Sequence, residues 1–89
     1  MANLYLVDRS VGQNGLELAK VDPDARVVLI QDGVYLGLAG SAAIGPRVYA
    51  IKQDVTRRGL GQRMSDGIEL IDYAVLVDLV VENKVINFA

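Results

Sequence analysis

Short apolar runs alternate along the chain with segments of mixed polarity. The most regular run is Val27 to Ile30, and Gln31, Asp32 and Gly33 follow it at once. A run of β-branched and leucine residues of this length is typical of a strand buried on both faces, as in a parallel sheet covered by helices. The pattern predicts five strands, at 4–7, 27–30, 47–51, 68–71 and 85–88.

Helical segments are predicted between these strands, at 15–20, 34–43, 55–58 and 73–82. Asp32, Asp54 and Asp72 each lie near the start of a helical segment, so we expect each carboxylate to cap free backbone N–H groups there. Gly59 is expected to end the third helix in the left-handed conformation of a C-cap.

Alternation of strand and helix indicates a parallel sheet with helices on both sides. We therefore predict an α/β fold, a three-layer α/β/α arrangement with a mostly parallel sheet of about five strands. With 89 residues, the chain is expected to form a single domain over 1–89.

The apolar content exceeds what so small a core should absorb, since 52% of the residues are hydrophobic. Much of the surplus lies in the helix predicted at 73–82, although a helix needs an apolar stripe only somewhat wider than about 100° to cover a sheet. We predict that this helix forms a subunit interface through Tyr73, Leu76, Leu79 and Val80. The alternative is that valine and leucine side chains are simply tolerated on the surface.

The absence of two residue types limits the chemistry. The chain has no cysteine and no histidine, which excludes a thiol nucleophile, a thiolate metal site and the usual general base near neutral pH. No phosphate-binding loop or nucleophile elbow is present either. We expect a protein that is not catalytic by itself, with no cofactor and no metal. Aspartates at 8, 32, 54 and 72 could hold Mg²⁺ together, but capping explains them more simply.

No segment is expected to enter a membrane. No run approaches the ~20 apolar residues that span a bilayer. The apolar run at 4–7 also lacks the basic flank of a signal peptide. We expect a cytoplasmic protein with no membrane partner.

Charge is distributed unevenly along the chain. The segment 47–63 has a balance of +4 and the segment 64–89 a balance of −4. This asymmetry suits electrostatic docking between subunits, with RNA phosphates as a weaker option and a solvated surface as the plain alternative. We assign Arg57 and Arg58 to a basic docking surface.

The carboxyl ends of the strands are the first place to look for a binding site, because open α/β sheets bind ligands and partners there. Ordinary turn chemistry also accounts for Asp-Gly at such a position. One hypothesis is a free-standing homodimer that binds a small anionic ligand near Asp32 and Lys52. A carboxylate-dependent hydrolase is disfavoured by the lack of histidine and cysteine. The candidate residues of a partner-facing or ligand-binding edge are Gln31, Asp32, Gly33, Tyr35, Lys52 and Asp54.

Several segments together resemble the TusB/DsrH family of small sulfur-relay subunits. They are LYLVDRS at 4–10, VVLIQDGVY at 27–35, VYAIKQDVTRRGL at 48–60 and IELIDYAVLVDLVVE at 68–82. The resemblance implies a DsrEFH-like α/β fold and a hetero-oligomer with TusC/TusD-like subunits, or with their DsrF/DsrE-like counterparts. It also implies a part in passing persulfide sulfur towards 2-thiolation of the tRNA wobble uridine, or in dissimilatory sulfur oxidation.

One position departs from the DsrH-type pattern. Members of that type carry a cysteine where this chain has Ala19. A chain without a thiol cannot carry a persulfide. The resemblance therefore favours the cysteine-free TusB type, a non-catalytic subunit of a sulfurtransferase complex with at most indirect tRNA contact. A DsrH-like role, or a homodimer when the partners are absent, are the alternatives.

Overall fold

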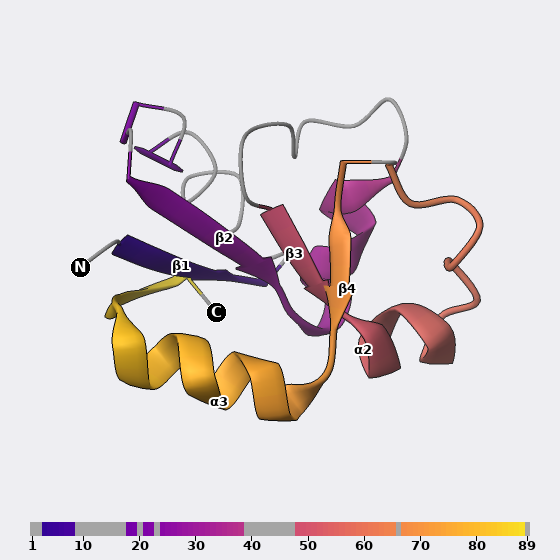
Figure 1. Cartoon of the computed structure of the whole chain (residues 1–89). Helices are drawn as coiled ribbons and strands as arrows, with labels where there is room; N and C mark the ends of the chain where they lie inside the picture. Colours follow the sequence, from indigo (N-terminus) through magenta and orange to yellow (C-terminus); the bar gives the residue numbers. More distant parts are fainter. Residues whose placement is uncertain are drawn as a thin grey trace.

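A five-stranded parallel sheet forms the centre of the molecule (Figure 1). The structure, a computed structural model, describes residues 3–8, 18–19, 21–22, 24–38, 48–65 and 67–88. The strand order is β4-β3-β2-β1-β5, so β4 and β5 are the edges. The strands are β1 (Asn3–Val7), β2 (Ala25–Leu29), β3 (Val48–Ile51), β4 (Glu69–Ile71) and β5 (Lys84–Phe88). The helices whose bounds lie within the described residues are the 3-10 helix η1 (Gln31–Gly37), α2 (Lys52–Arg57) and α3 (Tyr73–Glu82).

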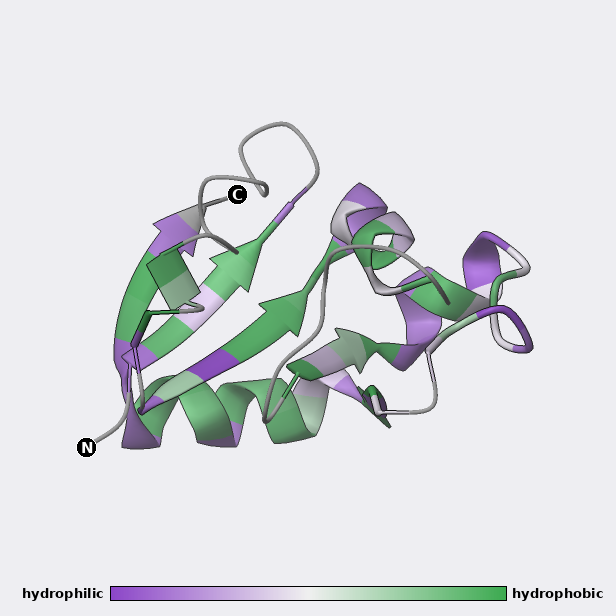
Figure 2. Cartoon of the chain, turned by 90° about the horizontal axis from the view of Figure 1, so that it is seen from above, coloured by the Kyte–Doolittle hydropathy of each residue, from purple (hydrophilic) through white to green (hydrophobic). Residues whose placement is uncertain are grey.

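The predicted α/β class with a parallel sheet of about five strands is confirmed. Each strand lies within two residues of its predicted bounds. The agreement follows from the apolar runs, because side chains alternate between the two faces of a strand and both faces are buried here. Figure 2 shows the central strands largely in hydrophobic green.

Two hydrophobic cores lie on opposite faces of the sheet. Tyr5 and Val7 of β1 belong to the first core, together with Val34 of η1 and Val55 of α2. Leu4 and Leu6, which alternate with them along β1, contact the second core, which α3 covers with Leu79. Helices therefore cover both faces, as predicted. Among the described residues no helix is long and apolar enough to cross a membrane.

Helix α3 has the predicted bounds and the predicted cap. The Asp72 carboxylate accepts a hydrogen bond from the Val75 backbone N–H, with Oδ1 at 3.0 Å from the nitrogen. At the other end, the Asn83 side-chain amide donates to the Leu79 carbonyl oxygen at 2.8 Å. Local side-chain bonds thus define both ends of this helix.

The predicted N-caps at Asp32 and Asp54 are wrong. Helix η1 already begins at Gln31 and α2 at Lys52, so both aspartates lie inside their first turns. Ile30 and Ile51 occupy the cap positions with extended backbone and no side-chain cap bond. Helix α2 follows β3 directly and only Ile30 separates η1 from β2, so both aspartates lie beyond the cap.

Helix η1 also differs from the helix predicted at 34–43. It starts three residues earlier and is a 3-10 helix, and Leu38 is already extended and forms an antiparallel bridge with Met64. The Gly37 carbonyl accepts a hydrogen bond from the Ser65 N–H at 2.8 Å, a tertiary contact that ends the helix. Residues 39–43 lie outside the described part of the chain.

Two further helix predictions have mixed outcomes. Helix α2 spans Lys52–Arg57 rather than 55–58, while Gly59 has a φ of 66° and confirms the expected left-handed conformation. Of the helix predicted at 15–20, only Leu18 and Ala19 are among the described residues, and both are helical.

Candidate functional site

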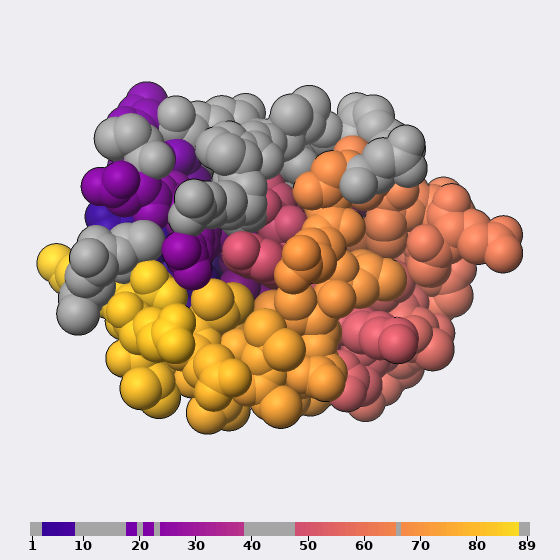
Figure 3. Space-filling model, viewed as in Figure 1, coloured from indigo at the N-terminus to yellow at the C-terminus, as the bar shows by residue number. Residues whose placement is uncertain are grey.

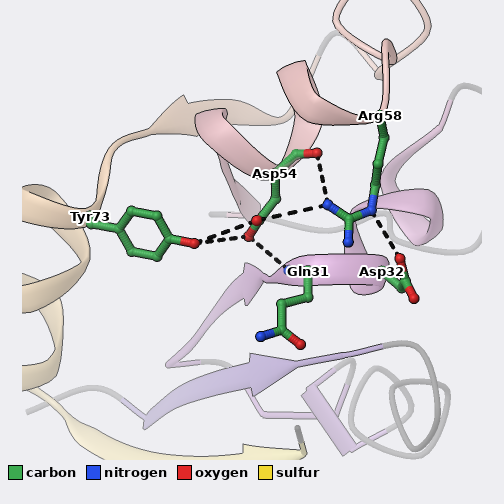
Figure 4. Close-up of polar contacts among 5 residues, drawn as sticks. All are labelled: Gln31, Asp32, Asp54, Arg58 and Tyr73. Carbon is green, nitrogen blue, oxygen red and sulfur yellow. Dashed lines mark hydrogen bonds and ion pairs between the residues drawn. The ribbon is translucent and has the colours of Figure 1, made fainter.

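A polar network joins three elements beyond the carboxyl ends of β2, β3 and β4 (Figure 4). We call Gln31, Asp32, Asp54, Arg58 and Tyr73 the carboxyl-end cluster. Asp54, in the first turn of α2, is 1% exposed. Its Oδ2 accepts a hydrogen bond from the Gln31 backbone N–H at 2.8 Å, and the Tyr73 hydroxyl lies 3.4 Å from both carboxylate oxygens. One buried carboxylate therefore connects η1, α2 and the first turn of α3.

Arg58 links this buried carboxylate to an exposed one. Its Nη1 donates to the Asp54 backbone oxygen at 3.1 Å and lies 3.8 Å from Asp54 Oδ1, while its Nε donates to Asp32 Oδ1 at 2.9 Å. Two carboxylates thus share one guanidinium, which leaves an excess of negative charge. A small-anion site near Asp32 and Lys52 therefore depends on Lys52 for its positive charge. Among the described residues, no three acidic groups converge so as to hold a metal ion.

Gln31 has an unusual backbone conformation, with a φ of 48°. A residue other than glycine rarely adopts this left-handed region, and it persists only where surrounding contacts hold it. Here the Gln31 N–H is bound to Asp54 and the Gly33 N–H to the Ile30 carbonyl at 2.8 Å. These bonds turn the chain sharply from β2 into η1 and leave the Gln31 side chain exposed.

The other predicted edge residues are not all accessible. Gly33 is buried, and a Cβ there would overlap the Val7 carbonyl oxygen, so glycine is needed for close packing of η1 on β1. Tyr35 is half-buried and packs on the first core. Lys52 is exposed at the start of α2.

The two predicted basic docking residues have different surroundings. Arg57 is exposed at the end of α2, whereas Arg58 is engaged by Asp32 and Asp54. Among the residues of this region that the structure describes, the exposed cations are therefore Lys52, Arg57 and Arg63.

The predicted interface residues of α3 point in two directions. Leu79 is buried and Leu76 is half-buried, and both pack on the second core, so they face the sheet rather than a partner. Tyr73 and Val80 are exposed. The prediction omitted the outward side chains Ala74, Val77 and Val81, because helical periodicity gives relative directions but not the side on which the sheet lies.

Ala19 lies in the first core. Its side chain is therefore buried in this chain.

A second polar cluster lies at the opposite, amino ends of β1 and β2. Asp22 accepts hydrogen bonds from the Asn3 side-chain amide at 2.7 Å, the Tyr5 hydroxyl at 3.0 Å and the Asp24 N–H at 3.0 Å. These bonds hold the pKa of Asp22 below its usual value, and the bond from Asn3 has the largest effect. Burial, together with Asp22, raises the pKa of Tyr5. The cluster fixes the segment before β2 to β1.

Comparison with known sequences gives a consistent set of relatives. The profile of a family described as DsrH-like protein matches residues 14–86. Protein TusB of Photorhabdus laumondii is 36% identical over 91 aligned residues, which cover 90% of this chain and 93% of that protein. Protein TusB of Pectobacterium parmentieri is 36% identical over 72 residues, covering 74% of this chain and 76% of that protein.

Solved structures with the same fold are also found. The ychN protein from E. coli superposes with a TM-score of 0.81 over 99% of both chains, at 22% identity, a likeness of fold alone. Protein Tm0979 from Thermotoga maritima has a TM-score of 0.66 at 30% identity, covering 90% of this chain and 92% of that one.

Proposed function

The chain belongs to the DsrH-like protein family, and from this premise we propose that it is a non-catalytic subunit of a sulfur-relay complex. The observation that carries the proposal is 36% identity to a protein named TusB over 90% of the chain, in a sequence without cysteine. A persulfide needs a thiol to hold it. The sulfur is therefore carried by another subunit, and this chain contributes to assembly.

The pathway we propose is 2-thiolation of the wobble uridine in tRNA, in the cytoplasm. The name TusB of both relatives supports this branch, as does Ala19 at the position of the DsrH-type cysteine. Dissimilatory sulfur oxidation is the alternative branch within the same family. The exposed cations Lys52, Arg57 and Arg63 add at most an indirect contact with tRNA.

The partners we propose are TusC- and TusD-like subunits. Exposed apolar side chains support a protein partner, because monomeric proteins rarely leave large contiguous apolar patches open. Among the described residues, the large hydrophobic side chains that are exposed gather on α3, which carries Tyr73, Val75, Val77, Val80 and Val81.

A deletion strain tests the pathway. Loss of this chain should lower the fraction of wobble uridine that is thiolated, measured by mass spectrometry of digested tRNA, and supplying the chain from a plasmid should restore it. Normal thiolation in the deletion strain would contradict the proposal.

A labelling experiment tests the non-catalytic role. The mixed complex is incubated with a cysteine desulfurase and cysteine that carries radioactive sulfur, and the subunits are separated without reductant. Label is expected on a sister subunit and not on this chain. Reductant-sensitive label on this chain would refute the assignment.

A further inference from the structure

The side of α3 that points away from the sheet is apolar. Leu79 is buried and Leu76 half-buried, which fixes the side that faces the sheet. At about 100° per residue, Ala74, Val77 and Val81 lie opposite to these leucines. Val77 is 59% exposed and Val81 is 77% exposed. We call Ala74, Val77 and Val81 the outer face of α3, and Figure 3 shows α3 as an open surface in orange and yellow.

The exposed apolar side chains are clustered on α3 and are not isolated residues. Of the nine large hydrophobic side chains that are exposed among the described residues, five lie on α3. A helix that only covers a sheet has a polar side opposite its apolar stripe. Helix α3 has apolar residues on both sides, so its outer face fits a helix that packs between two surfaces.

Acidic side chains lie along one flank of the outer face, because Asp78 and Glu82 follow it around the helix at about 100° per residue. Asp72, Asp78 and Glu82 are exposed, and no lysine or arginine lies within Tyr73–Glu82. Glu69 of β4 is also exposed. A partner must therefore match an apolar stripe with a negative rim.

A second copy of this chain matches that pattern poorly. Symmetric pairing of two α3 helices would bring one acidic rim against another, which costs free energy through like-charge repulsion. Helix α2 offers the opposite charge through Lys52 and Arg57, but its other exposed residues, Gln53 and Thr56, are polar, and Val55 is buried. Neither arrangement provides both an apolar contact and a basic rim.

We propose that the outer face of α3 docks a different chain, whose contact surface is an apolar stripe flanked by lysine and arginine. The inference rests on the proposed function, since it assigns this surface to a sister subunit of the relay complex. The valines supply affinity through buried apolar area, and the rim selects the partner over a second copy.

Matched valine substitutions test the apolar contact. Val77→Asp and Val81→Asp should each weaken binding to purified TusC- and TusD-like subunits by roughly tenfold to a hundredfold, measured by isothermal titration calorimetry. Val21→Asp is the control, because Val21 is 80% exposed and lies off α3. It should leave binding unchanged. Urea denaturation confirms that each variant is folded.

Charge reversal tests the rim. Asp78→Lys should weaken binding at low salt, and the difference from the unsubstituted chain should shrink at high salt, where charges are screened. Asp24→Lys is the matched control at an exposed aspartate off α3. An equal effect of both substitutions would overturn the proposed rim.

Three outcomes overturn the inference in distinguishable ways. If the unsubstituted chain binds its sister subunits and Val81→Asp binds them equally, the docking surface lies elsewhere and the proposed function stands. If the chain alone forms a dimer that Val81→Asp dissociates in analytical ultracentrifugation, the occupant is a second copy. If the unsubstituted chain binds neither sister subunit, the inference and the proposed function fail together.

Discussion

Asp54 is the buried charged residue on which the local geometry of the carboxyl-end cluster depends. Burying a carboxylate is costly unless hydrogen bonds and an opposite charge compensate it. Here the Gln31 N–H, the Tyr73 hydroxyl and the Arg58 guanidinium provide that compensation. The same bonds hold Gln31 in its left-handed conformation.

Asp54→Ala should lower the free energy of unfolding by about 2–4 kcal/mol, because the Gln31 N–H loses its acceptor and Arg58 loses a buried counter-charge. Urea denaturation measures the change. Arg57→Ala, at the exposed end of the same helix, should change it by no more than about 0.5 kcal/mol. Equal effects of the two substitutions would show that the network contributes nothing specific.

Sequence reasoning selected Asp54 as a site residue but assigned it the wrong partner. A capping prediction considers N–H groups two or three residues further along the chain. The N–H that Asp54 binds is that of Gln31, 23 residues away. Such a contact exists only after β2 and β3 have paired, so no local pattern contains it.

At the scale of elements, three aspartates in similar sequence positions have three different roles. Asp72 caps α3, Asp54 is buried inside α2, and Asp32 forms an exposed ion pair with Arg58. Only the first role depends on neighbouring residues alone.

The three roles predict an order of stability losses. Asp72→Ala should lower the free energy of unfolding by about 1 kcal/mol, the usual contribution of an N-cap. Asp32→Ala should lower it by about 0.5 kcal/mol or less, because exposed ion pairs contribute little. Guanidinium denaturation followed by circular dichroism gives both values. A larger loss for Asp32→Ala than for Asp72→Ala would contradict this order.

The sequence pattern predicts best those elements whose bounds depend on their own residues. The five strands follow from apolar runs, and α3 follows from its cap and its length. Helix η1 was predicted less well, since a bond from Ser65 to Gly37 ends it. The pattern also does not predict which side of α3 faces the sheet. That side depends on the contacts of α3 with β1 to β4, most of which lie far away in the sequence.

For the molecule as a whole, Asp22 makes stability depend on pH. Its pKa in the folded chain is lower than its usual value of 3.8, so the ionised form stabilises the folded state above that value. The contribution is lost as the pH falls through the lowered pKa.

The free energy of unfolding should therefore fall more steeply on acidification for the unsubstituted chain than for Asp22→Asn. The difference between the two, present at neutral pH, should diminish well below pH 3.8, as measured by urea denaturation across a pH series. Asp24→Asn, at an exposed position, is the control. If the free energy of unfolding depends on pH in the same way for both proteins, Asp22 does not cause the pH dependence.

The position of β1 between β2 and β5 has a consequence for biosynthesis. The register pairs Asn3 with Lys84, so one side of the earliest strand finds its neighbour only when β5 has left the ribosome. Until then the nascent sheet presents a line of unsatisfied backbone groups, a known risk for misassembly with other chains. This edge of β1 therefore stays open until β5 pairs with it.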